Sequence, residues 1–220
     1  DPHNILLGRG PAHRLSAEQI RDSALAASGL LDKTPGGPPV APYQPGGDLW
    51  REANTMSPPF RQSTGTALHR RSLYSVWKRT APLPNMLAFD SATRETCSVR
   101  RPRTNTPLQA LVLLNDVQFI EAARALAQQT LRDRAGDDPA RLPAPFSRLS
   151  GRPPLPAEAA ILNELLVQQL DHFRTHPDEA AALLAHGETK PDPALDPADL
   201  AAWTVVCQTV INTDGFAWKR

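Results

Sequence analysis

Seven arginines between residues 70 and 103 provide the side chains in this sequence that are best suited to bind a ligand. They are Arg70, Arg71, Arg79, Arg94, Arg100, Arg101 and Arg103. A guanidinium group can bind a carboxylate, sulfate or phosphate group through two parallel hydrogen bonds. Thr104, Asn105 and Thr106 follow at the start of an expected helix, where the helix dipole attracts negative charge. These ten residues form a candidate anion-binding site.

Internal ion pairs are the alternative to an anion-binding site. Residues 61–110 contain nine lysines and arginines against two acidic residues, whereas the whole chain has 24 basic and 23 acidic residues. The basic middle of the chain is therefore flanked by acidic segments. Asp90, Glu95 and Asp116 lie within or beside the arginine-rich region. Because charged clusters of this kind are often architectural, we place internal pairing ahead of ligand binding.

A histidine pair could contribute to a metal site. His172 and His176 are four residues apart at the end of an expected helix, and this spacing puts two ligands on one helix face. No third ligand is evident, because Asp171 and Asp178 fit ordinary surface positions. We therefore expect a solvated helix end and no metal site.

Two cysteines are present, Cys97 and Cys207, and the sequence leaves open a disulfide between them or a thiolate pair of Cys97 with His69. No Cys-x-x-Cys or Cys-x-x-Cys-His motif occurs, which excludes covalent haem attachment and a cysteine zinc site within this chain. Four aromatic residues could stack on sugar rings, although aromatics this sparse are more often core anchors. They are Tyr43, Trp50, Tyr74 and Trp77.

No catalytic residue can be named from the sequence. A phosphate-cradling glycine loop, a nucleophile elbow and a dinucleotide fingerprint are all missing. We therefore expect a segment without a cofactor and favour a non-enzymatic role. The near-neutral net charge of +1 and the mixing of basic with apolar residues argue against a nucleic-acid partner. No apolar run reaches the roughly 20 residues that a membrane-spanning helix needs.

The candidate site leads directly into an expected helix. Thr106 suits the N-cap position, Pro107 suits the first helical position, and Gln109 can complete a capping box. The run that follows is the most apolar in the chain. It predicts a helix in the core, with Leu111 buried.

Cap signals and apolar periodicity predict further helices. Ser16 and Gln19 form another capping box, and in the helix that follows Arg21 and Asp22 are expected to face outward or to pair. The expected helices cover residues 17–28, 69–80, 107–115, 117–134, 156–173, 178–185 and 197–212. A short strand at 74–76 is the alternative to the helix at 69–80. Proline-rich connections are expected at 34–47 and 136–154.

These elements predict a mostly α protein, an irregular helical domain with long Pro/Gly-rich loops. The chain has 23 prolines and only 5% aromatic residues, which favours helices built on Ala and Leu over strands.

Nearly the whole chain resembles a known family. The motifs that carry the resemblance are Arg70-Arg71-Ser72-Leu73-Tyr74, Trp77-Lys78-Arg79-Thr80, Phe89-Asp90, Arg94 with Cys97, Arg100-Arg101-x-Arg103-Thr104-Asn105-Thr106-Pro107-Leu108-Gln109-Ala110-Leu111 and Leu114-Asn115-Asp116. Near the start, Asp1-x-x-Asn4-x-Leu6-Leu7-x-Arg9 and Ala17-Glu18-x-Ile20-Arg21-Asp22 match as well. On these residues the chain resembles the C-terminal domain, of unknown function, of planctomycete-type cytochrome-c-associated secreted multidomain proteins.

The resemblance implies a place in a larger protein. Residues 1–220 are expected to be the C-terminal part of a single family domain, with a motif-bearing core at 1–135, a linker-like loop at 136–155 and a helical subdomain at 156–220. The resemblance also implies an extracytoplasmic location, periplasmic or secreted, with any haem held in upstream domains. It brings no established catalytic residues.

Two hypotheses about function follow. The first is a non-catalytic helical module that packs on upstream domains of the same polypeptide. The second is binding or processing of an anionic polysaccharide, sulfated or rich in uronic acid, through the arginine cluster.

Overall fold

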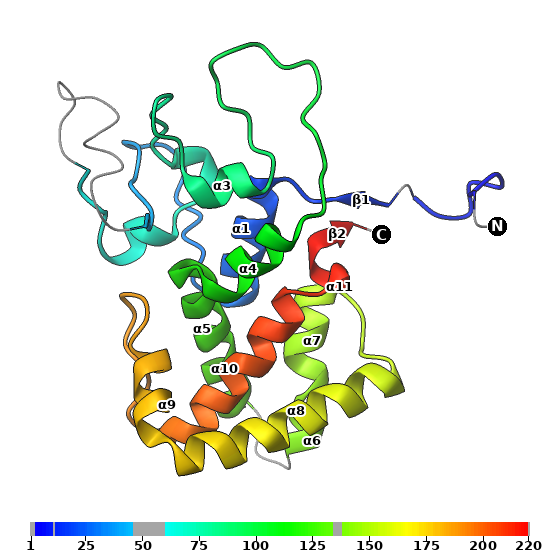
Figure 1. Cartoon of the computed structure of the whole chain (residues 1–220), viewed down its shortest axis with the longest axis vertical. Coiled ribbons are helices and arrows are strands. Elements are labelled where there is room, and N and C mark those ends of the chain that lie inside the picture. The colour runs from blue at the N-terminus through cyan, green and yellow to red at the C-terminus, as the bar shows by residue number, and fades with distance from the viewer. Residues whose placement is uncertain (1–2, 11, 46–59, 134–137, 220) are drawn as a thin grey trace.

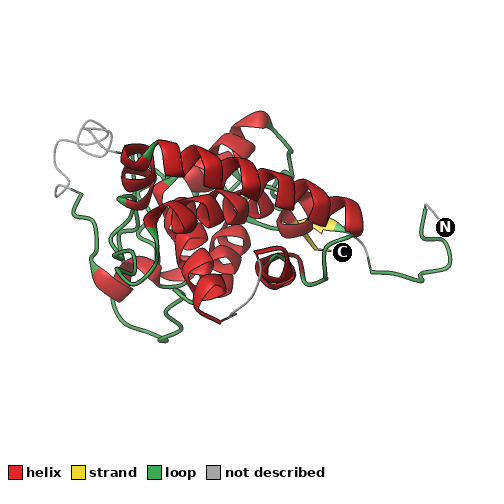
Figure 2. Ribbon diagram, turned by 90° about the horizontal axis from the view of Figure 1, so that it is seen from below, coloured by secondary structure: helices red, strands yellow, loops and turns green. Residues whose placement is uncertain are grey.

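The computed structural model describes residues 3–10, 12–45, 60–133 and 138–219, and it confirms a mostly α fold (Figure 1, Figure 2). The longer helices are α1 (Ala17–Ala27), α4 (Pro107–Asn115), α5 (Val117–Asp133), α7 (Pro143–Ser150), α8 (Pro156–Thr175), α9 (Pro177–Leu184) and α10 (Pro197–Ile211). The short elements are β1 (His13–Arg14), α3 (Pro84–Ala88), α6 (Asp138–Arg141), α11 (Asp214–Ala217), β2 (Trp218–Lys219) and the 3₁₀ helices η1 (Gly65–His69) and η2 (Ser72–Tyr74). None of the helices in these ranges has the length and hydrophobicity to cross a membrane.

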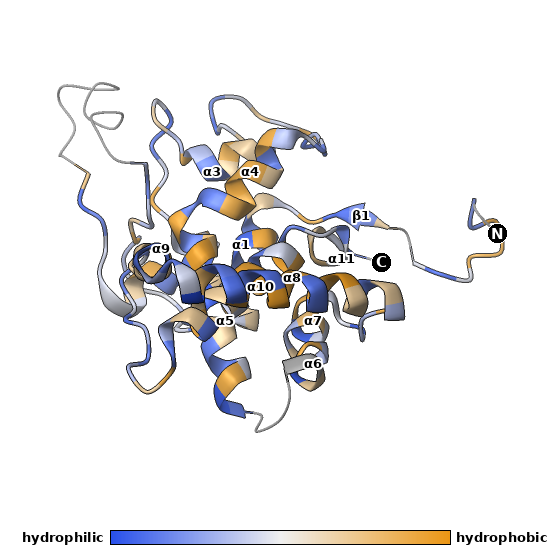
Figure 3. Ribbon diagram, turned by 60° about the horizontal axis from the view of Figure 1, so that its bottom comes forward, coloured by the Kyte–Doolittle hydropathy of each residue, from blue (hydrophilic) through white to orange (hydrophobic). Residues whose placement is uncertain are grey.

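Helix α10 forms the centre of the core. Its sequence is apolar on nearly all sides, and Ala201, Ala202, Trp203 and Cys207 are completely shielded from solvent. Helices α5, α8 and α9 pack around it. Figure 3 shows hydrophilic and hydrophobic residues alternating along these helices, and Ile161 and Val167 of α8 are apolar side chains that remain exposed. Most members of the buried apolar cluster lie in residues 117–217, and the arginine-bearing segment 70–103 contributes only Leu83, Met86 and Phe89.

The expected starts of three helices are confirmed. In α1 the Ser16 N–H donates to Gln19 Oε1 at 2.9 Å and the Gln19 N–H donates to Ser16 Oγ at 3.3 Å. Thr106 and Gln109 form the capping box of α4. Asp196 accepts hydrogen bonds from the first turn of α10. The capping hydrogen bonds at each start come from residues within one turn, so local sequence decides where these helices begin.

A two-stranded sheet joins segments from opposite ends of the described chain. Strands β1 and β2 pair antiparallel, with His13 opposite Lys219 and Arg14 opposite Trp218. The pairing continues where the Leu15 N–H donates to the Ala217 carbonyl at 2.9 Å. Figure 1 shows β2 beside β1, next to the N-terminal end of α1. The sheet therefore fixes the entry to α1.

Helix α4 is less buried than its apolar sequence predicts. Gln109 and Leu113 are 0% and 2% exposed, but Leu108 and Leu111 are 57% and 55% exposed. The expectation that Leu111 lies in the core is therefore wrong. Helix α4 packs on α3, α5 and α10, and these neighbours cover only one of its faces.

Residues 69–80 do not form the helix that their spacing predicts. The structure has η1 and η2 in this region, followed by an irregular segment. Arg21 of α1 donates to the Arg70 carbonyl at 2.6 Å and to the Leu68 carbonyl at 2.7 Å. A continuous helix would need carbonyl groups of this segment for its own N–H groups, and a tertiary contact holds them instead.

Helix α7 lies where a proline-rich connection is expected. Pro143 takes the first helical position, where its missing N–H costs nothing, and Phe146 and Leu149 are buried. Gly151 ends the helix in the left-handed conformation, with φ at 73°. The buried apolar cluster includes residues from each of the three expected parts of the chain. The boundaries proposed for these parts stay a prediction.

Candidate functional site

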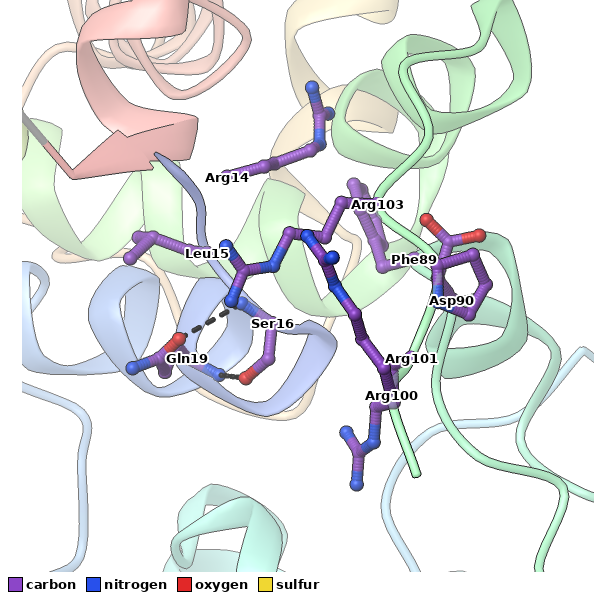
Figure 4. A pocket seen from close by; sticks show the side chains of 10 residues that line it. Arg14, Leu15, Ser16, Gln19, Phe89, Asp90, Arg100, Arg101 and Arg103 are labelled. Carbon is purple, nitrogen blue, oxygen red and sulfur yellow. Dashed lines mark hydrogen bonds between the residues drawn. The ribbon is translucent and has the colours of Figure 1, made fainter. Parts of the chain in front are cut away.

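Arginines 100, 101 and 103 line one surface pocket of about 310 Å³ (Figure 4). We call it the arginine pocket, and its lining is Arg14, Leu15, Ser16, Gln19, Phe89, Asp90, Arg100, Arg101, Pro102 and Arg103. Three segments meet here: β1 with the start of α1, the residues after α3, and the segment that leads into α4. Figure 4 shows the side chains of Arg101 and Arg103 extending toward the first turn of α1, whereas Arg100 points away from it.

Asp90 fixes the segment that carries these arginines. Its carboxylate accepts hydrogen bonds from the Thr104 N–H at 2.7 Å and from the Thr104 hydroxyl at 2.9 Å. The buried Gln109 amide donates to the Ala88 carbonyl at 2.9 Å and to Thr104 Oγ1 at 3.0 Å. Asp90 has a φ of 59°, in the left-handed region that Asp tolerates better than most residues. Thr104 therefore ties the arginine segment to the end of α3.

Arg101 has a carboxylate partner. Its Nη1 lies 2.9 Å and 2.8 Å from the two carboxylate oxygens of Glu18, in the first turn of α1. The two side chains are 42% and 31% exposed, so solvent reaches the pair. Burial acts to raise the pKa of Glu18, but hydrogen bonds from its own backbone and from Arg101 hold that pKa below its ordinary value.

Arg100 and Arg103 differ from Arg101 in this respect. Within residues 3–10, 12–45, 60–133 and 138–219, no hydrogen bond or ion pair reaches either guanidinium group. The one carboxylate that lines the arginine pocket belongs to Asp90 and is already engaged by Thr104. The pocket therefore has an excess of positive charge.

Arg14 also lines the pocket, although the sequence does not mark it as a site residue. It is only 7% exposed, its Nη1 donates to Asn105 Oδ1 at 2.9 Å, and its guanidinium lies 5.9 Å from the centroid of the Phe89 ring. Its Nε is buried with no hydrogen-bond partner in the described part of the chain. Burial lowers the pKa of Arg14, against the opposing effect of Asp214 and Asp90. An arginine nevertheless keeps its charge at neutral pH.

Four of the seven predicted arginines, Arg70, Arg71, Arg79 and Arg94, lie outside the arginine pocket. Arg71 and Arg94 line a neighbouring pocket, together with Arg101. The Arg94 guanidinium also lies 4.9 Å from the centroid of the Trp77 ring, a cation–π contact. Arg79 is exposed and lines neither pocket.

Arg70 is separated from the cluster by its own contacts. It is 7% exposed and donates to the carbonyl groups of Thr34 and Pro38, at 3.1 Å and 3.0 Å, and to that of Gly36. Its guanidinium stacks 3.9 Å from the centroid of the Tyr74 ring. The Tyr74 hydroxyl accepts a hydrogen bond from the Gly36 N–H at 2.8 Å. Arg70 therefore organises the loop at residues 34–38 and does not face a ligand pocket.

The last two predicted site residues, Asn105 and Thr106, position the segment at the start of α4. Asn105 accepts the hydrogen bond from Arg14, and Thr106 is the N-cap of α4. The Thr106 N–H donates to Gln109 Oε1 at 3.4 Å. Thr104, Asn105 and Thr106 thus position the arginine segment, and none of their side chains lines the pocket.

The histidine pair stays a surface feature. His172 and His176 stack with ring centroids 4.6 Å apart, and His172 Nε2 lies 2.8 Å from a Glu179 carboxylate oxygen. In the described part of the chain, no group of three or more His, Cys, Asp or Glu side chains could hold a metal ion.

Neither of the two options for the cysteines is found. Cys97 is exposed, Cys207 is buried, and both are free thiols, so no disulfide joins them. His69 faces Glu121 instead of a thiol, with its Nε2 3.0 Å from a Glu121 carboxylate oxygen. Burial raises the pKa of the Cys207 thiol well above its ordinary value, which makes that thiol unreactive.

Three of the four aromatic residues have partners within the fold. The Tyr43 hydroxyl donates to the Glu121 carboxylate at 2.9 Å. Tyr74 and Trp77 lie against arginine guanidinium groups, as described above. Trp50 lies outside the described residues. Stacking of Tyr43, Trp50, Tyr74 or Trp77 on sugar rings stays a prediction.

Two buried arginines are among the polar residues that the sequence did not indicate. The expected pairing of Arg21 with Asp22 is confirmed, with Arg21 Nη1 3.5 Å from Asp22 Oδ1. What the sequence did not indicate is burial: Arg21 is 2% exposed and Arg124 is 1% exposed. Helical spacing contained a signal for the first, because Ala17, Arg21 and Ala24 lie on one face of α1 and all three are buried. The burial of Arg124 depends on carbonyl groups about 60 residues later in the chain, which no local pattern reveals.

Comparison with known proteins identifies a family and leaves its activity open. No curated protein and no solved structure gives a significant match. A family model described as "Protein of unknown function (DUF1553)" matches residues 1–166, and this range includes every residue that lines the arginine pocket. The chain therefore belongs to the DUF1553 family of proteins of unknown function.

Proposed function

We propose that this chain binds anionic groups of a polysaccharide, sulfate or uronic-acid carboxylate, in the arginine pocket. The observation that carries this proposal is the state of Arg100 and Arg103, which line the pocket and have no carboxylate partner among the described residues. If the cluster were only architectural, each guanidinium group should meet an acid or a set of carbonyl groups. Arg70 does so, whereas these two do not.

An anion in this pocket removes an electrostatic cost. Four arginines and one aspartate line the pocket, and the positive charges of neighbouring guanidinium groups repel one another. A sulfate or carboxylate that accepts hydrogen bonds from Arg103 and a neighbouring guanidinium neutralises part of this charge. Charge-assisted hydrogen bonds of this kind contribute about 1.5–3 kcal/mol each. The pocket volume of about 310 Å³ is at the lower end of the range for small-molecule sites.

A thermal-shift titration tests the proposal. Sulfate, phosphate and an oligogalacturonate are titrated against the chain and against Arg103→Gln. We expect the melting temperature to rise with anion concentration, because a ligand that binds only the native state stabilises it. The variant should lose most of this rise.

Arg79→Gln is the matched control, since Arg79 is exposed, belongs to the same arginine-rich region and lines neither pocket. The control removes one positive charge but should keep the full shift. An equal loss in both variants would mean that the chain responds to ionic strength and not to a bound anion.

A second candidate function is a docking module, and the exposed leucines of α4 favour it. Leu108 and Leu111 lie one turn apart on α4 and are more than half exposed, next to a segment that is otherwise well anchored. Exposed apolar side chains gathered in this way are typical of surfaces that pack against another part of a protein. The expected partner is the upstream part of the same polypeptide.

The docking candidate has its own test. Leu111→Ser should leave the stability of this chain nearly unchanged, because the side chain is already solvated. It should weaken association with a separately produced upstream segment, measured by calorimetry. Unchanged association would remove this candidate and leave anion binding untouched.

The setting that the family resemblance suggests also belongs to the proposal. We expect a planctomycete-type, cytochrome-c-associated protein in the periplasm or outside the cell, with any haem held upstream and no cofactor in this segment. In such a setting, acidic polysaccharides are accessible partners. Fractionation of cells that produce the full-length protein tests the expected location.

A further inference from the structure

A second pocket continues the arginine pocket along helix α1. It has a volume of about 610 Å³, and its lining includes Arg71, Arg94 and the exposed Leu73. The two pockets share Arg101 and Gln19 in their linings. The ion pair of Arg101 with Glu18 therefore lies at the junction between them.

The two pockets together have an excess of positive charge. Six arginines and three acidic residues line the pair, which leaves a net charge of +3. All three carboxylates already accept hydrogen bonds: Asp90 from Thr104, Glu18 from Arg101, and Asp22 from the Ser72 N–H and hydroxyl, at 2.8 Å and 2.6 Å. The acids are thus engaged within the protein, whereas the guanidinium groups of Arg71, Arg100 and Arg103 have no hydrogen bond or ion pair in the described part of the chain.

We propose that the two pockets are successive subsites for one linear oligosaccharide with repeated negative charges, and that the ligand crosses the Arg101–Glu18 pair. This inference rests on the proposed function of the arginine pocket and adds to it the length of the ligand. A single sulfate or uronic acid fills one pocket. A chain with a charge on each sugar can place one charge near Arg103 and another near Arg71 and Arg94.

The residues at the junction favour a sugar chain over an acidic peptide. The Gln19 side chain is exposed and lines both pockets, and its Oε1 accepts the capping hydrogen bond from the Ser16 N–H. Its amide N–H groups have no acceptor in the described part of the chain and can donate to a ligand. A donor between two groups of guanidinium side chains suits a ligand in which hydroxyl groups alternate with charged groups. Two subsites on one chain also strengthen binding, because the second contact is made intramolecularly.

Calorimetry with oligogalacturonates of two lengths tests the inference. A dimer and a hexamer are titrated against the chain, Arg103→Gln, Arg71→Gln and the control Arg79→Gln. The hexamer should bind at least tenfold more tightly than the dimer. Arg71→Gln should weaken the hexamer about tenfold and leave the dimer unchanged, while Arg103→Gln should weaken both.

Each contrary outcome has a distinct meaning. Equal affinity of dimer and hexamer, with Arg103→Gln still weakening both, overturns the two-subsite inference and leaves the proposed function standing. Binding of neither length removes both. Hexa-aspartate that binds as tightly as the hexamer, and that responds to the same variants, would contradict the choice of a sugar chain. Circular dichroism of each variant confirms that it is folded.

Discussion

Arginines occupy two contrasting environments in this molecule. Arg21 and Arg124 are almost completely buried, and hydrogen bonds to carbonyl groups hold them. Arg100 and Arg103 lie at the surface and meet no carbonyl group or acid in the described ranges. The buried arginines connect loops to helices that are distant in sequence. The comparison indicates that a guanidinium group with its donors filled is part of the architecture, whereas one with free donors is available to a ligand.

The largest expected effect concerns a buried arginine. Arg21 donates to Gln118 Oε1 at 2.6 Å as well as to the two carbonyl groups near η1 and η2. Arg21→Met keeps the length of the side chain but leaves these buried acceptors unpaired. We expect a loss of about 3–5 kcal/mol in the free energy of unfolding, measured by urea denaturation. Arg174→Met is the control, because the Arg174 side chain is 62% exposed, and it should cost less than about 1 kcal/mol. Similar losses in the two variants would contradict the distinction between buried architectural arginines and exposed arginines.

The next effect concerns the acid beside Arg124. The Glu121 side chain is fully buried, and it accepts hydrogen bonds from His69, Tyr43 and Thr189. Burial acts to raise its pKa, but the hydrogen bonds from His69 and Thr189 outweigh this effect and lower the pKa of Glu121 to about 2. A carboxylate with a depressed native pKa stabilises the fold above its unfolded pKa, and that stability is lost as pH falls through the native pKa.

Glu121 should therefore contribute about 3 kcal/mol at neutral pH that disappears between roughly pH 4.5 and pH 2. Urea denaturation at several pH values measures this contribution. Glu121→Gln should flatten the dependence in that window, at the cost of lower stability at neutral pH. If the free energy of unfolding of Glu121→Gln still fell with pH as it does in the wild type, other carboxylates would be responsible for the pH dependence.

A smaller effect is expected for the partly exposed pair at the junction of the pockets. Arg101→Ala removes the contact with Glu18, and exposed pairs contribute about 0.2–1 kcal/mol. We expect a loss in this range in urea denaturation, together with weaker anion binding. Raising the salt concentration should reduce the difference between wild type and variant, since exposed charges are screened. A loss above about 2 kcal/mol would place Arg101 with the architectural arginines.

The smallest stability effect is expected for Arg103. Arg103→Gln removes a charge with no partner in the described residues, so the free energy of unfolding should change by less than about 0.5 kcal/mol. Relief of repulsion within the cluster can make the change slightly favourable. The same variant should lose the anion-induced rise in melting temperature. Strong destabilisation would show that Arg103 belongs with Arg21 and not with a binding site.

The sequence was most informative where the structure depends on neighbouring residues. The capping boxes at Ser16 and Thr106 and the start of α10 were all predictable, because the interacting groups lie within one turn of each other. The gathering of Arg100, Arg101 and Arg103 at one place could also be predicted, since they are almost consecutive.

The sequence was least informative where distant segments compete for the same groups. Residues 69–80 have helical spacing, but Arg21, about 50 residues earlier in the chain, donates hydrogen bonds to the carbonyl groups of Leu68 and Arg70. Leu111 sits in an apolar run, but which face of α4 is covered depends on α3, α5 and α10. Arg14 precedes Arg103 by almost 90 residues in the sequence, and only the tertiary fold brings the two residues to the same pocket. Spacing along the chain does not contain this information.

The pairing of β1 with β2 has a consequence for the order in which the pocket forms. Arg14 belongs to β1 and lines the arginine pocket, and its backbone is held by residues 217–218 near the other end of the described chain. Closing a loop of about 200 residues costs conformational entropy, which the buried packing of α11 has to offset. During synthesis, that contact becomes possible only after α10 and α11 have emerged. The complete lining of the arginine pocket therefore forms only once the C-terminal helices have folded back onto the beginning of α1.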